Sequence, residues 1–259
     1  MLINLLFFII SIVPSVLVFV SLRNRRKCDP LYVKSCNSAF IRGLICILPI
    51  VILSAIFHVT RNILTSIIFP DMNALVSQAI YTFIVLAFSE ELVKYLMFRH
   101  LLNKKINDYS WADVTAYMVI IGNVFGLVED IPYALGASPV IMLIRGFTLG
   151  HVGCGFIMGW FYGKHLKTGK KIYSVVAFSL PFFIHGLYDF SLSKELLAIN
   201  DNLAFIALSL ALLDIVLIIL MIRFFRISPK KDHYNVPLTQ GEHRSSSSPQ
   251  SIDICSKTI

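Results

Sequence analysis

The feature that most constrains the fold is a series of apolar segments, each about 20 residues long, which is the length of helix that crosses a bilayer. Of the 259 residues, 56% are hydrophobic and only 15% are charged. We therefore predict an all-α fold, a polytopic membrane helix bundle of about seven transmembrane helices. The predicted spans are Leu2–Val20, Phe40–Val59, Ala74–Phe98, Trp111–Ile131, Val140–Tyr162, Ile172–Leu192 and Leu203–Phe225.

The basic residues predict the orientation of this bundle. With the N-terminus outside, nineteen of the 23 Lys and Arg residues fall on the cytoplasmic side. Cytoplasmic loops of membrane proteins carry such an excess. We therefore predict an outside N-terminus and a cytoplasmic C-terminus. We then interpret the formal charge of +8 as a topology signal that also favours contact with the lipid bilayer. We expect no nucleic-acid partner.

The composition changes after residue 227. Residues 1–227 carry all the apolar segments, whereas residues 228–259 contain Lys230-Lys231, four consecutive serines from Ser245 to Ser248 and few apolar side chains. Such a segment cannot build a core. We predict a transmembrane domain over residues 1–227 and a disordered cytoplasmic tail over residues 228–259.

Two adjacent carboxylates and an ammonium interrupt the third apolar segment. Glu90 and Glu91 precede Lys94 by four and three residues, so both can reach it on one helical face. A structural ion pair is one interpretation, but a single carboxylate would satisfy a single lysine. Two carboxylates that compete for one ammonium should differ in proton affinity, which suits a general base beside an electrostatic support.

A second acidic pair, Glu129-Asp130, lies late in the fourth predicted span. Gly122 and Gly126 precede Glu129 by seven and three residues, and a stripe of glycines lets another helix approach closely. The pair could also mark the helix end at the membrane interface. For Asp130, this interpretation and a functional role fit the sequence equally well.

The fifth and sixth spans each contribute a histidine. His185 and Asp189 are one helical turn apart, so the carboxylate can orient the imidazole. Each histidine alone could be a satisfied interhelical hydrogen-bonding group. His151 begins a ladder of small residues at four-residue spacing, which places its ring on a tight-packing face; the ladder continues with Gly155, Gly159 and Gly163.

Four successive spans thus bring acids or histidines into the membrane interior, where ionisable groups are costly and usually functional. A shared polar cavity of this kind, without a serine or cysteine nucleophile motif, indicates that a carboxylate or a bound metal activates water. The alternative is a non-enzymatic transporter or binding protein that uses the cavity for a cation or proton. Weaker candidates are Cys154 and Asp214, a lone acid in the seventh span.

The order of four motifs resembles the PrsW family of intramembrane proteases, which is similar to the group of CAAX prenyl endopeptidases and bacteriocin-processing enzymes. The resemblance covers roughly residues 74–195. The motifs are Glu90-Glu91-x-x-Lys94, Phe125-x-x-x-Glu129, His151-x-x-x-Gly155 and His185-x-x-x-Asp189.

The resemblance implies an endopeptidase of the bacterial plasma membrane that cuts a membrane-anchored protein, in the family the first cut of an anti-sigma factor on its extracytoplasmic side. It implies that Glu90 or Glu91 polarises water while His151 and His185 bind a metal or steady the oxyanion, with Glu129 as a further ligand or acid. The implied metal ligands are Glu129, His151 and His185, around one divalent ion such as zinc. The sequence leaves a glutamate-only mechanism equally open. The supporting residues are Lys94, Asp130 and Asp189.

The predicted site residues differ in expected depth. At about 1.5 Å per residue along each helix, Glu90 and Glu91 fall in the inner half of the membrane, His151 near the middle, and Glu129 and His185 in the outer half. Helix tilt or a broken helix would have to bring them together.

Overall fold

The computed structural model describes residues 2–102, 109–136 and 150–228, and this part of the chain is helical throughout, without a strand. Three consecutive helices between residues 30 and 68 continue one another, as do three between residues 74 and 102. The elements are α1 (Leu2–Asn24), α2 (Pro30–Ile45), α3 (Ile47–Ile63), the π-helix η1 (Leu64–Ile68), α4 (Ala74–Ile80), the π-helix η2 (Tyr81–Phe88), α5 (Ser89–Leu102), α6 (Trp111–Gly136), α8 (Gly150–Thr168), α9 (Lys171–Ser191), α10 (Lys194–Leu197), the 3-10 turn η4 (Asp201–Leu203) and α11 (Ala204–Ile227).

The polytopic helical bundle is confirmed. Large apolar side chains are exposed along most of the outer helices, as expected of a surface that faces lipid. α1 and α8 complete the seven long helices of the prediction. Five helical runs are long and apolar enough to cross a membrane, namely Pro30–Ile68, Ala74–Leu102, Trp111–Ile131, Lys171–Ser191 and Ala204–Ile227.

The second helix begins ten residues earlier than predicted, at Pro30. Asp29 caps it by accepting hydrogen bonds from the backbone N–H groups of Leu31 and Tyr32, both at 3.0 Å, and proline is favoured at the first helical position. Tyr32, Cys36 and Ala39 form a buried stripe at helical spacing on α2, which packs against α6. The sequence prediction missed the first ten residues of α2 because the side of the helix opposite this stripe is polar.

Other boundaries shift less, and some predictions fall outside the described residues. α5 ends at Leu102 rather than Phe98, and α6 continues to Gly136. The first ten residues of the predicted fifth span lie outside the described residues, as do residues 229–259 of the predicted tail. The N-out orientation stays a prediction.

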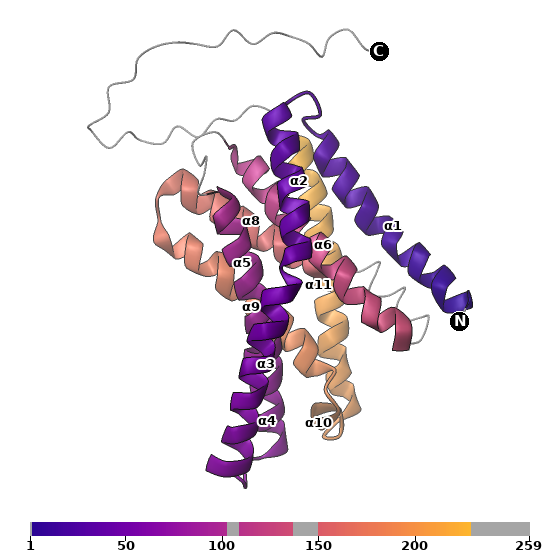
Figure 1. Ribbon diagram of the computed structural model, residues 1–259, viewed down its shortest axis with the longest axis vertical. Helices are drawn as coiled ribbons and strands as arrows, with labels where there is room; N and C mark the ends of the chain where they lie inside the picture. The colour runs from indigo at the N-terminus through magenta and orange to yellow at the C-terminus, as the bar shows by residue number, and fades with distance from the viewer. Residues whose placement is uncertain (1, 103–108, 137–149, 229–259) are drawn as a thin grey trace.

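α6 lies at the centre of the bundle and is its most buried span. In Figure 1, α1 slants along one edge of the bundle, where it packs on α6 and α2. α8 runs antiparallel to α6 at very close range: a Cβ atom at Gly155 would lie 3.0 Å from the Met118 carbonyl oxygen, and one at Gly159 would lie 2.8 Å from Thr115 Cα. The glycine ladder therefore determines how deeply α8 enters the bundle.

The π-helix η2 leads directly into the paired glutamates. π-Helical turns are rare and often mark functional sites. η2 packs on α9, where a Cβ atom at Gly186 would lie 2.5 Å from Phe83 Cδ1. This close approach holds the start of α5 against the part of α9 that carries His185.

Candidate active site

Glu90 and Glu91 occupy the first turn of α5, and Lys94 follows one turn later. Lys94 Nζ donates to Glu91 Oε1 at 2.6 Å, whereas it lies 3.9 Å from Glu90 Oε2. The Glu91 and Lys94 side chains are each 1% exposed, and Glu90 is 12% exposed. The two carboxylates therefore differ in partner, and Lys94 is committed to Glu91.

His151 stands at the start of α8 and bridges two other helices. Its Nδ1 lies 3.1 Å from Lys94 Nζ and its Nε2 lies 2.5 Å from Glu129 Oε2 on α6. An ammonium can only donate, so Nδ1 accepts and Nε2–H donates to Glu129.

Two residues of α6 make room for the His151 ring. A Cβ atom at Gly126 would lie 2.9 Å from His151 Cδ2, so the absence of a side chain there leaves space for the imidazole. Phe125 packs against the ring at 5.0 Å between centroids and an interplanar angle of 82°. The predicted glycine stripe on α6 thus positions the histidine.

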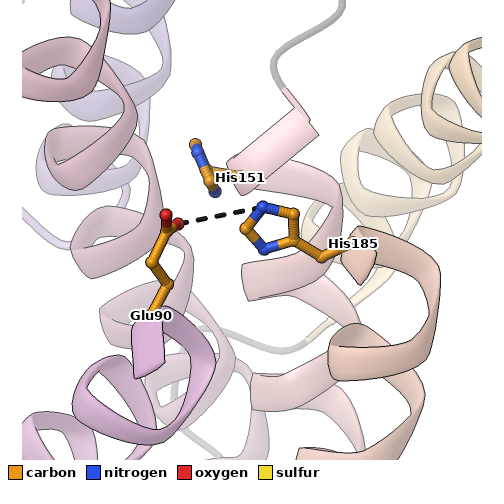
Figure 2. Close-up of side chains that lie close together, drawn as sticks. All are labelled: Glu90, His151 and His185. Atoms are coloured by element: carbon orange, nitrogen blue, oxygen red, sulfur yellow. Dashed lines mark ion pairs between the residues drawn. The ribbon is translucent and has the colours of Figure 1, made fainter. Parts of the chain in front are cut away.

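His185 on α9 completes the group. Its Nδ1 lies 2.9 Å from Glu91 Oε1, and its Nε2 lies 3.3 Å from Asp189 Oδ2 and 3.8 Å from Glu90 Oε2. The two imidazole rings are 5.3 Å apart. Figure 2 shows Glu90 pointing toward both of them from α5.

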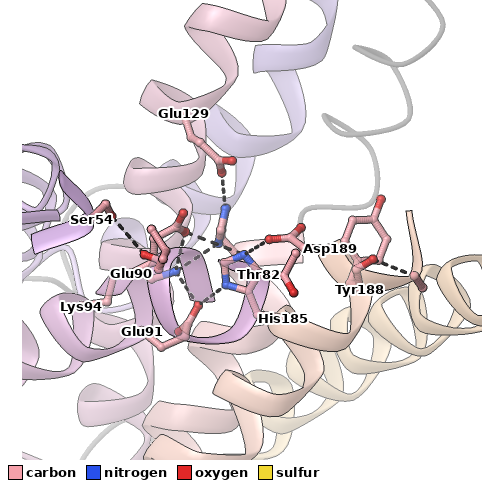
Figure 3. A network of polar contacts seen from close by, with 12 residues as sticks. Ser54, Thr82, Glu90, Glu91, Lys94, Glu129, His185, Tyr188 and Asp189 are labelled. Carbon is pink, nitrogen blue, oxygen red and sulfur yellow. Dashed lines mark hydrogen bonds and ion pairs between the residues drawn. The ribbon is translucent and has the colours of Figure 1, made fainter. Parts of the chain in front are cut away.

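The predicted site residues of α5, α6, α8 and α9 therefore meet in one network (Figure 3). The depth difference expected from residue counting does not keep them apart. Asp130 lies beside the network, in the wall of the adjacent cavity. The joined residues are Glu90, Glu91, Lys94, Glu129, His151, His185 and Asp189.

The donor set of the site suits a divalent metal. Glu90, His151 and His185 each offer one potential ligand atom, and these three atoms all lie within 4.8 Å of one another. A carboxylate with two imidazoles is a known ligand set for catalytic zinc. Glu90 Oε2 is buried without a hydrogen-bond partner among the described residues. The network also contains four carboxyl groups and only one lysine ammonium, an acidic excess of the kind that a bound cation offsets.

The geometry changes one member of the expected ligand set. Glu90, rather than Glu129, is grouped with the two histidines. Glu129 instead forms a hydrogen bond with Nε2 of His151, and Glu91 forms one with Nδ1 of His185. Carboxylates in these positions orient histidine ligands in metal sites.

A cavity of about 110 Å³ opens next to the network. Both histidines, Glu129 and Asp189 line it on one side. Glu90 lies next to this wall of the cavity, through its contact with His185. Cys154 also faces this space but forms no ion pair with the histidines, and a thiol nucleophile has no support.

Four further polar residues line this cavity that the prediction did not place in the site: Ser15, Asn123, Tyr188 and Asp214. The signal for Asp214 was present in the sequence as a lone acid in an apolar helix. Asn123 precedes the Phe125 motif by two residues, and an amide in a span is a weaker signal than a charge. Ser15 follows Pro14 in α1 and carried no signal.

Comparisons with known proteins agree with this geometry. Residues 35–222 match a family model described as PrsW family intramembrane metalloprotease. The matched range contains all the residues of the network. No curated protein and no solved structure matches the chain significantly.

Proposed function

The chain belongs to the PrsW family of intramembrane metalloproteases, and we propose that it is an endopeptidase that hydrolyses a peptide bond in a membrane-anchored protein. The observation that carries this proposal is Glu90: its Oε2 is buried and has no hydrogen-bond partner among the described residues, and it lies 3.8 Å from His185 Nε2. This carboxylate oxygen is therefore available to accept a hydrogen bond from a water molecule.

In the proposed reaction, Glu90 takes a proton from water as the oxygen attacks the substrate carbonyl. The negative charge then forms on the carbonyl oxygen, and His151 and His185, which line the cavity, are the residues placed to offset it. Glu90 returns its proton to the leaving amine nitrogen as the carbon–nitrogen bond breaks, and the carboxylate is regenerated.

The neighbouring residues keep Glu90 available for this role. Glu91 accepts from Lys94 and from His185, so it acts as a support and not as the base. Glu129 and Asp189 orient the two imidazoles. A divalent metal, zinc by ligand type, would be held by Glu90, His151 and His185, with His151 exchanging its hydrogen bond to Lys94 for the metal. It would supply Lewis-acid polarisation when bound, and the base role of Glu90 described above belongs to the metal-free site.

We further propose a single-span substrate of the anti-sigma-factor kind, cut on its extracytoplasmic side in a bacterial plasma membrane. The support is the motif order that the chain shares with the PrsW family. The cavity is lined by Glu129, His185 and Asp189, and these residues fall in the outer half of the predicted membrane.

The test compares cells that express the wild type with cells that express Glu90→Gln, by mapping new N-termini in membrane proteins. We expect at least one single-span protein to be cut only with the wild type. Its cleavage should also be lost in His151→Ala and His185→Ala. Full cleavage in these variants would refute the proposal, as would ion flux in proteoliposomes without any proteolysis.

Two variants serve as matched controls. His165→Ala changes a residue of α8, like His151→Ala, but the His165 ring bonds the Lys170 carbonyl and packs on Tyr162 at the other end of the helix. Glu195→Gln lies on α10, away from the network. Both should cleave as the wild type does, and size-exclusion profiles in detergent show whether each variant is folded.

A further inference from the structure

We propose that Asn123 and Asp214 form a hydrogen-bond acceptor subsite that receives main-chain N–H groups of the substrate beside the cleaved bond. The inference rests on the proposed endopeptidase function. It adds a positioning role for two residues that lie outside the four motifs of the family resemblance.

Each residue presents an unused acceptor. Asn123 Nδ2 donates to the Ser15 carbonyl oxygen at 2.9 Å, which leaves Asn123 Oδ1 without a partner, and Asp214 Oδ2 likewise has none among the described residues. Asn123 is 2% exposed and Asp214 is 8% exposed. Both line the cavity that contains His151 and His185.

The surroundings argue against a purely structural role for Asp214. A Cβ atom at Gly153 would overlap Asp214 Oδ1, so the carboxyl group of α11 sits where only a glycine of α8 leaves space. A buried polar group without a partner is costly. Asp214 lies in the wall of the cavity while its Oδ2 is buried, so the acceptor becomes available when a substrate enters and displaces the wall.

Substrate main chain fits these acceptors better than other ligands do. A helical segment must unwind locally before a protease can reach its peptide bond, and the freed N–H groups must find acceptors at membrane depth. Asn123 Oδ1 and Asp214 Oδ2 each offer an acceptor. The cavity of about 110 Å³ holds several waters before a substrate enters, and the N–H groups would replace these waters.

The position of Asn123 predicts which N–H groups are involved. Asn123 precedes Glu129 by six residues on α6, a separation of about 9 Å along the helix. An extended chain rises about 3.3 Å per residue. The subsite should therefore receive the main chain about three residues from the cleaved bond.

The test uses a substrate found by the mapping of N-termini proposed above. It is prepared in versions that each carry one amide-to-ester replacement within four residues of the cleaved bond. An ester keeps the side chain and removes the N–H donor. We expect one such replacement to raise KM roughly 3- to 10-fold with the wild type, as loss of one buried hydrogen bond predicts. With Asp214→Leu, KM should be raised to a similar degree, and the same ester should cause no further loss.

Two variants separate this role from a structural one. Asp214→Asn keeps an acceptor oxygen and should stay within about 2-fold of the wild-type KM. Ser209→Leu, on an exposed part of the same helix, should leave KM unchanged. Asp214→Leu should unfold at the same temperature as the wild type or higher, because it removes an unpartnered buried carboxyl group.

Failure of the subsite is distinguishable from failure of the proposed function. If the wild type cuts no membrane protein, the proposed function fails and the subsite fails with it. If the wild type cuts its substrate but no ester changes KM, or the ester and Asp214→Leu act independently, only the subsite is refuted. Dependence on a basic substrate side chain, and not on an N–H group, would also refute it.

Discussion

Lys94 and Glu91 form a buried ion pair in which Nζ and Oε1 lie 2.6 Å apart and both side chains are 1% exposed. The pair assigns different roles to two adjacent carboxylates, because the ammonium is 3.9 Å from Glu90. The same Glu91 oxygen accepts from His185. Each glutamate keeps one buried oxygen without a hydrogen-bond partner among the described residues, but only Glu91 bonds both the ammonium and an imidazole. We therefore propose that Glu91 supports the site and that Glu90 carries the chemistry.

The two glutamates should respond differently to removal of charge. We expect Glu90→Gln to lower cleavage by about 10² to 10⁴-fold, the range for a general base, with little loss of thermal stability. Glu91→Gln should lower both, because it breaks a buried pair. Cleavage rates and detergent unfolding temperatures measure the two effects, and equal unfolding temperatures for both variants would contradict the assignment.

The ion pair should also show coupling in a double-mutant cycle. Lys94→Met leaves the Glu91 carboxylate buried without its cation, which costs about 3–5 kcal/mol in comparable buried pairs. Lys94→Met combined with Glu91→Gln should recover part of that stability but not activity, because His185 loses an orienting carboxylate. Chemical unfolding of the four proteins gives the coupling energy. Additive losses would show that the two side chains do not depend on each other.

Much of this site could be predicted from the order of its polar residues. Acids and histidines inside apolar helices are rare enough that their positions indicate a shared site, and residues such as Glu129 and His151 indeed meet. The spacing of Gly155 and Gly159 also predicted the close approach of α8, because a glycine ladder has few other uses in a membrane helix.

What the sequence did not provide was the arrangement across helices. Residue counting placed Glu90 and His185 at different depths, since it assumes straight α-helices along the membrane normal. The π-helix η2 and the packing of Gly186 on Phe83 are tertiary features without a sequence signature. The grouping of Glu90 with the histidines follows from side-chain direction, which spacing alone does not determine.

Metal content should distinguish Glu90 from Glu129 as a ligand. We expect about one divalent ion per purified chain, lost on treatment with a chelator together with cleavage, and both restored by zinc. Glu90→Ala should lower metal content strongly. Glu129→Gln should retain most of it at saturating zinc, because loss of an orienting carboxylate weakens affinity only about 10- to 100-fold.

Elemental analysis of each variant checks this prediction, with Glu195→Gln as the control. Metal loss in Glu129→Gln alone would make Glu129 the ligand. Full activity in a chain freed of metal would leave water activation to Glu90 and the imidazoles without a metal.

The space beside the His151 ring gives the last prediction. A methyl group at residue 126 would lie 2.9 Å from His151 Cδ2, so Gly126→Ala must displace the imidazole that bonds Glu129 and Lys94. A displacement near 1 Å can cost about 10²-fold in rate, and we expect cleavage to fall by at least about 10-fold. Gly150→Ala is the matched control, because a Cβ atom there meets no atom of the described residues within 4 Å, although Gly150 also lines the cavity. Cleavage of the same substrate by both variants measures the effect, and equal rates would show that the ring tolerates displacement.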